Sequence, residues 1–248
     1  MTGDLERVRE AIINCERCSR LRSYCRRIGR EKRAAYRSDT YWARPVPGFG
    51  DPRAAIAIIG LAPAAHGANR TGRNFTGDGA GGSGDFLMAA LHSNGLANQA
   101  TSRSRDDGLE LRNAWIGAAV RCAPPDNRPT PAEVSACQPH LAAELAALPN
   151  LRVYVALGRI AYDACWRLLG KGKRPPFGHG ARYRTDDGRI VVAAYHPSRQ
   201  NTNTSRLTPA MLREVFRKAV KCAGLSEGKG QRAKGKGEVK GKRAEDPE

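Results

Sequence analysis

The sequence predicts an α/β protein in which a parallel sheet is covered by helices on both faces. Four short apolar segments have the length and composition of buried strands, at residues 54–60, 114–122, 151–158 and 189–195. Stretches with a helical period of apolar residues lie between and after them. This alternation is typical of a parallel sheet with helices on each side.

The helices carry local signals of their own. Amphipathic periodicity is present over five segments: residues 4–14, about 83–94, 130 to about 148, the end of the third strand to about 169, and from 208 onward. Thr130-Pro131-Ala132-Glu133 is a capping box with proline at the first helical position. Thr208-Pro209 starts the last helix, and Gly95 follows the helix at about 83–94.

The chain of 248 residues is long enough for one well-packed domain with additions. We expect a domain at residues 1–223 and a disordered tail at 224–248, which is rich in Gly, Lys and Glu and has no apolar period. No apolar run reaches the roughly 18 residues of a membrane span. The polar N-terminus has no signal-peptide core, so we expect a cytoplasmic protein without a membrane partner.

The charge predicts a polyanionic partner. The formal net charge is +18 and the sequence pI is about 10.2, within the range of nucleic-acid-binding domains. Residues 224–248 contribute only +2, which leaves +16 on residues 1–223. Arginines are dense over residues 16–37, where a solvated helix face and a phosphate-binding surface are about equally good interpretations.

Four of the seven cysteines form two pairs, Cys15-x2-Cys18 and Cys122-x14-Cys137, which 103 residues separate. In a chain expected to be cytosolic, cysteines favour metal binding or buried thiols over disulfides. Two distant segments would have to meet around one metal centre. Four thiolates suit either zinc or an iron–sulfur cluster, and the spacing leaves both open.

Polar residues gather where three of the predicted strands end, in loops 60–78, 122–130 and 196–207. Functional loops of parallel sheets lie at these carboxyl ends. The first loop is glycine-rich and holds His66, Asn69, Phe75 and Asp78, which favours a ligand site over a simple turn. Asn127 in the second loop would by itself be a turn residue, and His196 at the start of the third would by itself more often be structural.

Several long motifs, taken together, resemble a known family. The cysteine pattern, YWARPVPGFGDP, GLAPAAHGANRTGRNFTGD, CAPPDN and HPSRQNTNTSRLT are similar to the family 5 (type B) uracil-DNA glycosylases, iron–sulfur enzymes of base-excision repair. The resemblance covers about residues 5–223. Two positions depart from the family pattern: Asn74 stands where proline is usual, and Ser205 where glycine is usual.

The resemblance implies a three-layer α/β/α sandwich with a four-stranded parallel sheet. It also implies a monomeric prokaryotic enzyme that removes uracil, and other deaminated or modified bases such as hypoxanthine, from DNA to leave an abasic site. A structural [4Fe–4S] cluster would be held by Cys15, Cys18, Cys122 and Cys137, with Cys25, Cys165 and Cys222 as non-ligands.

The resemblance also assigns roles within the three loops. His196 would donate to the uracil O2 side, while Asp78 and Asn127 would place water or support the sugar cation. Several other uracil-DNA glycosylase families carry an Asp, Asn or Glu early in the first motif to activate water, but residues 62–65 here are Ala-Pro-Ala-Ala. The expected substrate-binding residues are Gly60, Ala62, His66, Asn69, Phe75, Ser198, Arg199 and Gln200.

Two other interpretations remain. A non-enzymatic nucleic-acid-binding protein with a structural metal site would explain the charge and the cysteines, but not the polar residues at three separate strand ends. The family 4 iron–sulfur glycosylases usually carry a glutamate after Gly-x-Ala-Pro, which this chain lacks.

Overall fold

The computed structural model describes residues 2–170 and 172–226. The predicted disordered tail falls almost wholly on residues 227–248, which lie outside the described residues. No described helix combines the length and the apolar character that crossing a bilayer requires.

A six-stranded mixed sheet forms the centre of the molecule, in the order β1-β3-β2-β4-β6-β5. Its four inner strands are parallel and coincide with the four predicted ones: β2 (Ile56–Gly60), β3 (Ala114–Ala118), β4 (Val153–Leu157) and β6 (Ile190–Ala194). The predicted α/β fold is therefore confirmed.

The expected count of four strands was too low, because a short antiparallel strand lies at each edge. These strands are β1 (Phe49–Gly50), which pairs with β3, and β5 (Arg182–Arg184), which pairs with β6. Neither has a buried apolar pattern. Backbone pairing with the neighbouring strand defines them, and that pairing leaves no periodic signal in the sequence.

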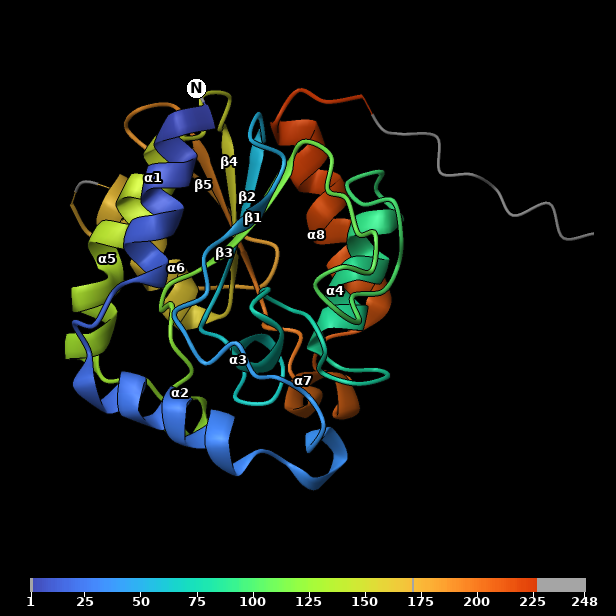
Figure 1. Cartoon of the computed structure of the whole chain (residues 1–248). Coiled ribbons are helices and arrows are strands. Elements are labelled where there is room, and N and C mark those ends of the chain that lie inside the picture. Colours follow the sequence, from blue (N-terminus) through green and yellow to red (C-terminus); the bar gives the residue numbers. More distant parts are fainter. Residues whose placement is uncertain (1, 171, 227–248) are drawn as a thin grey trace, which may run out of the picture.

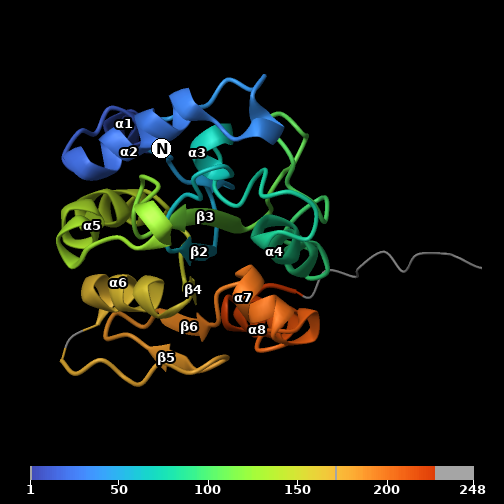
Figure 2. The same cartoon turned by 90° about the horizontal axis from the view of Figure 1, so that it is seen from below.

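Helices cover both faces of the sheet (Figures 1 and 2). One face carries α5 (Pro131–Ala146) and α6 (Arg159–Leu169), with α1 (Thr2–Ile13) packed on α5. The other carries α4 (Ser83–His92) and α8 (Pro209–Cys222). The predicted capping box forms, since the Thr130 hydroxyl accepts from the Glu133 N–H at 3.2 Å and the Glu133 carboxylate accepts from the Thr130 N–H at 2.8 Å.

The remaining helical segments gather at the carboxyl ends of the inner strands, at the bottom of Figure 1. All except α2 are short, and most of them were not predicted. They are α2 (Ser19–Glu31), η1 (Ala34–Tyr36), α3 (Ala68–Thr71), η2 (Pro125–Asn127) and α7 (Arg199–Asn203).

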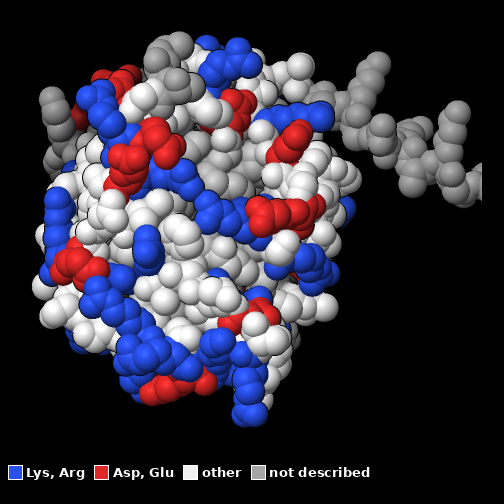
Figure 3. Space-filling model, in the orientation of Figure 1, with Lys and Arg blue, Asp and Glu red and all other residues white. Residues whose placement is uncertain are grey.

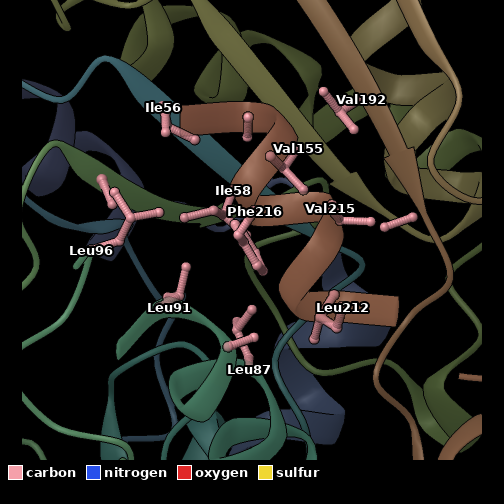
Figure 4. Close-up of a cluster of buried hydrophobic side chains, with 14 of the residues drawn as sticks. Ile56, Ile58, Leu87, Leu91, Leu96, Val155, Val192, Leu212, Val215 and Phe216 are labelled. Atoms are coloured by element: carbon pink, nitrogen blue, oxygen red, sulfur yellow. The ribbon is translucent and has the colours of Figure 1, made fainter. Parts of the chain in front are cut away.

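Alternate residues of the inner strands face two separate cores. Ile56, Ile58 and Val155 point toward α4 and α8, where they meet Leu87, Leu91, Leu212 and Phe216 (Figure 4). Ala57, Ile59 and Tyr154 point the other way, toward α5 and α6. Because both faces are buried, the strands are continuously apolar and show no polar alternation.

A buried ion pair connects the sheet to α5. Arg121, just beyond β3, and Glu144 of α5 are 1% and 2% exposed and join through 2.8 and 3.2 Å hydrogen bonds. The same carboxylate accepts from the Gly48 N–H at 2.7 Å. Removing one partner would leave an uncompensated charge in the interior, which is strongly destabilising.

We therefore predict that Glu144→Gln lowers the free energy of unfolding by about 3 to 5 kcal/mol, because Arg121 keeps its charge without a counter-ion. Glu214→Gln is the control, since Glu214 forms an exposed pair with Arg217 on α8 and should cost at most about 1 kcal/mol. Urea unfolding followed by circular dichroism measures both. Equal losses of unfolding free energy in the two variants would show that the buried pair contributes no more to stability than the exposed one.

Candidate active site at the carboxyl edge of the sheet

His196, Phe75 and Gly60 form one contact where β6 and β2 end. The rings of Phe75 and His196 stack with centroids 5.8 Å apart and planes inclined by 29°. A Cβ on Gly60 would lie 2.8 Å from the Phe75 ring, so only glycine lets the ring lie against the strand. Phe75 has φ +53°, a left-handed conformation that is rare for a bulky residue and is often found at functional sites.

The surroundings of His196 keep its imidazole neutral. Burial lowers the pKa of His196 to about 4, so the ring carries no charge at neutral pH. The Asn201 side chain donates to the His196 carbonyl at 2.8 Å and fixes the turn that presents the ring.

Gly158, the N-cap of α6, was not predicted as a site residue. A Cβ on Gly158 would lie 3.4 Å from Cβ of His196, and its φ of +93° belongs to the region that glycine favours. The signal for it in the sequence is the glycine that ends the third predicted strand.

Asp78, at the end of the first loop, lies against Gly67 of the same loop. A Cβ on Gly67 would collide with its carboxylate, so that glycine provides the space which the acid occupies. Burial raises the pKa of Asp78, while the Gly84 N–H and the guanidinium groups of Arg199 and Arg70 counter the shift. Arg199 also donates to the Asp78 carbonyl at 3.4 Å, which connects the first and third loops.

His66 is half-buried, and the hydroxyl of Tyr41 lies 3.0 Å from its Nδ1. Desolvation lowers the pKa of His66, and Arg33 and Arg70 lower it further. Tyr41 was not among the predicted site residues, although it belongs to the YWARPVPGFGDP motif of the resemblance.

Asn69, one of the predicted substrate-binding residues, is fully buried in this structure, and its amide nitrogen lies 3.4 Å from the carbonyls of Cys25 and Ala65. In this conformation the side chain supports the first loop from inside the protein.

The other predicted residues lie at the surface of the second and third loops. Asn127 is exposed with φ +56°, and among the described residues it makes no hydrogen bond to His196 or Asp78. Ser198 caps α7 by accepting from the Asn201 N–H, while Arg199 and Gln200 are exposed.

The two positions that depart from the family pattern differ in their surroundings. Ser205 has φ +55°, the left-handed region in which glycine is unstrained, so the usual glycine has a direct explanation. Asn74 is buried, and its side chain donates to the Pro47 carbonyl at 3.0 Å, which a proline could not do.

The predicted cysteine ligands share one region of the interior. Cys122 and Cys137 belong to a buried apolar cluster with Leu21 and Val134, and Cys18 packs against it. Cys15 interacts electrostatically with Cys18 and Cys137 and contributes to the raised pKa of each thiol, although burial contributes most. Within the described residues, no set of three or more Cys, His, Asp or Glu is arranged as a preformed metal site.

The donor set nevertheless suits a thiolate-ligated metal centre. Two distant segments each bring a pair of sulfurs to this region, and the Arg121 N–H donates to the Cys137 sulfur at 3.3 Å. Cys25 is also present: it is buried, hydrogen-bonds with Cys122, and lies 3.6 Å from the Ala123 carbonyl. Ala62 of the first loop packs on the same cluster.

A cavity of about 340 Å³ lies elsewhere, between α1 and β1. Leu5, Arg9, Phe49 and Trp115 are among its lining residues, and none of the predicted site residues belongs to it. The candidate site therefore stays at the strand ends, because this cavity contains none of the residues that define it.

Comparison with known families identifies the superfamily of the chain. The family model described as the uracil DNA glycosylase superfamily matches residues 47–220, which include all three strand-end loops. The chain belongs to the uracil-DNA glycosylase superfamily.

Curated relatives in the type-5 group cover most of the chain. A type-5 uracil-DNA glycosylase of Thermus thermophilus is 50% identical over 90% of this chain and all of its own length. One of Mycobacterium tuberculosis is 47% identical over 90% of this chain and 83% of its own.

Pyrobaculum aerophilum offers both groups for comparison. Its type-5 enzyme is 48% identical over 86% of this chain and 91% of its own. Its type-4 enzyme is 31% identical over 68% and 67%. The resemblance to the type-5 group is confirmed at the level of the family.

We predict that the His196 imidazole stays neutral down to about pH 5, because burial lowers its pKa to about 4. Ring resonances of isotopically labelled histidine, assigned through a His196→Gln variant, report the titration by NMR. A midpoint near the ordinary histidine value of about 6.5 would show that water reaches the ring freely.

Proposed function

We propose that the protein hydrolyses the N-glycosidic bond of uracil in DNA and leaves an abasic site, as the first step of base-excision repair. The observation that carries the proposal is the contact of His196, Phe75 and Gly60 at the carboxyl ends of β6 and β2, with Asp78 on the same loop as Phe75. Hypoxanthine and other deaminated or modified bases are proposed as further substrates.

The chemistry requires groups of the kind found in this loop cluster. A base inside a duplex is out of reach, so the target nucleotide must rotate out of the helix into a pocket. As the bond breaks, negative charge develops on the leaving base and positive charge on the deoxyribose. A fixed hydrogen-bond donor at the base and a polar or anionic group at the sugar both lower that barrier.

His196 suits the role of donor to uracil O2. A neutral imidazole donates through one ring N–H and places no full charge beside the unreacted base. The Phe75 ring would offer an apolar face for the flipped pyrimidine. Gly60 leaves room for that ring at the end of β2, and the half-buried Ala62 would line the pocket.

Asp78 and Asn127 would share the work at the sugar. Residues 62–65 contain no acid, which leaves Asp78 as the carboxylate of the first loop. Its half-buried position beside Arg199 and Arg70 suits a group that supports the sugar cation or orients water. Asn127 would join it when the second loop meets the substrate, since its side chain is exposed.

Binding of the duplex would involve the third loop. Ser198 and nearby backbone amides would contact phosphates, while the exposed Arg199 and Gln200 would lie where the base leaves the stack. One chain holds all the proposed pocket residues, which supports a monomeric enzyme. Its DNA substrate supports a location in the cytoplasm of a prokaryotic cell, beside the nucleoid.

We also propose that Cys15, Cys18, Cys122 and Cys137 hold a [4Fe–4S] cluster. Four thiolates occupy every position that such a cluster offers to protein, and base excision needs no electron transfer, so its contribution would be structural. The cluster would join the segment before α2 to the end of β3 and to α5, next to the first loop.

His196→Ala should lower the single-turnover rate of uracil excision by about 100-fold, because one pre-oriented donor to the developing anion is lost. The affinity of the variant for the duplex should stay close to that of the unchanged protein. A uracil-containing duplex and alkaline cleavage of the product measure the rate, and His92→Ala, an exposed histidine of α4, is the control. No strand cleavage by the unchanged, cluster-loaded protein would favour the alternative of a non-enzymatic nucleic-acid-binding protein.

Cys137→Ala should lose the visible absorbance, iron and sulfide of the cluster. It should also give little folded protein, because the metal-mediated link between two distant segments of the chain is lost. Cys222→Ala, outside the proposed ligand set, should keep all of them. A folded, brown Cys137→Ala protein would overturn the proposed ligands, and stoichiometric zinc in place of iron would overturn the cluster.

A further inference from the structure

The structure divides the arginines of residues 16–37 into two groups. Five of the eight are bound within the protein by carboxylates or carbonyls: Arg17, Arg20, Arg22, Arg26 and Arg27. The other three, Arg30, Arg33 and Arg37, are exposed and have no acidic partner or hydrogen-bond acceptor for their side chains among the described residues. These three are called the arginine arm below.

Arg70 fixes the arm to the first loop. Its guanidinium donates to the carbonyls of His66 and Gly77, both at 2.8 Å, and to the Asp39 carboxylate at 2.6 Å. The same group lies 3.9 Å from the ring centroid of Tyr36, at the end of η1. The Arg70 guanidinium therefore connects the first loop to Tyr36 and Asp39, which lie on either side of Arg37 in the sequence.

The helix that carries Arg30 is held equally closely. The Asn69 amide lies 3.4 Å from the Cys25 carbonyl, and Arg22 donates to the Ala43 carbonyl at 3.1 Å. Gly29 faces Ala43 so closely that a Cβ would lie 2.9 Å from the alanine methyl. The arm therefore has a fixed position relative to the pocket.

The arm also lies at the same end of the molecule as the proposed pocket. Figures 1 and 2 place α2 beside α3 at the carboxyl ends of the strands, and Figure 3 shows basic side chains along that lower edge. Arg33 lies near enough to His66 to contribute to the lowered pKa of that histidine. With Lys32, residues 30–37 carry four positive charges against the single acid Glu31, and a row of phosphates would relieve their repulsion.

We propose that Arg30, Arg33 and Arg37 bind phosphates of the duplex on one flank of the flipped nucleotide. The contact is independent of sequence, and it extends the footprint past α2 on the β3 side of the pocket. The third loop, with Arg199 and Gln200, would then contact the DNA at the flipped nucleotide itself. This inference rests on the proposed function for its choice of partner, but binding tests it without any excision.

The test replaces Arg30, Arg33 and Arg37 together by alanine and measures binding to a duplex with a central tetrahydrofuran abasic-site analogue over a range of salt concentrations. The slope of log affinity against log salt should fall by about 2 to 3, and affinity at moderate salt by about 10- to 100-fold. The excision rate at saturating enzyme should not change, because the arm does not touch the reacting base.

A matched triple variant removes the same charge from the opposite edge of the sheet. Arg53, Arg112 and Arg184 are exposed and have no acidic partner among the described residues. Arg53 and Arg112 lie just before β2 and β3, and Arg184, the last residue of β5, pairs with Ile190 at the amino end of β6. Their replacement by alanine should change the slope by less than about 1. Lysine at positions 30, 33 and 37 should keep most of the slope, which distinguishes lost charge from a disturbed fold.

Shortening the duplex on either side of the analogue tests the direction. Removal of one flank should abolish the difference between the arm variant and the unchanged protein, while removal of the other should leave it. Equal effects of the arm and control triples, or an arm variant that binds normally but excises slowly at saturation, would overturn the proposal. If the unchanged protein excises nothing while the arm effect persists, the proposed function fails and the arm does not.

Discussion

The pair between Arg121 and Glu144 determines how the elements around the site are placed. Two charges that are almost completely buried must remain paired and hydrogen-bonded, so the elements that carry them cannot move apart. The carboxylate also binds the Gly48 N–H, while the Arg121 carbonyl accepts from Val46 and its N–H donates to the Cys137 sulfur. The end of β3, the helix α5 and the chain leading into β1 are thus held together.

The cysteine region and the proposed pocket both follow from that arrangement. Cys122 comes one residue after Arg121, and Cys137 lies two helical turns before Glu144, so the pair sets the position of both sulfurs. Ala62, at the start of the first loop, packs on the cluster that contains them. A centre bound there would support the wall of the pocket and the beginning of α2 at once, with no part in the reaction.

The distribution of charge suits a protein that binds a polyanion and releases an anionic base. The outside of the strand-end edge is basic, whereas the pocket residues His196 and Phe75 are uncharged at neutral pH. Asp78 is the acid of the loop that also carries Phe75, and the Gly84 N–H and the charges of Arg199 and Arg70 temper the effect of burial on its pKa. The surface would therefore attract DNA over a distance, while the proposed pocket would hold the base by stacking and directed hydrogen bonds.

The sequence by itself determined the four inner strands, the capped helix α5 and the three loops at the strand ends. Each of these depends on residues close together in the chain: an apolar run, a capping box, or the order of a strand and its loop. The motifs also identified the family, because long spaced patterns are specific even where single residues are ambiguous.

Only the tertiary structure decided the edge strands β1 and β5, the buried position of Asn69, the contacts of Tyr41 and Gly158, and which arginines remain free. Arg20 and Arg30 are indistinguishable in the sequence, yet Glu133, 113 residues away, binds the first and nothing binds the second among the described residues. Whether a charge is neutralised, or a polar side chain is buried, depends on partners that folding brings from distant parts of the chain, and local periodicity carries no information about them.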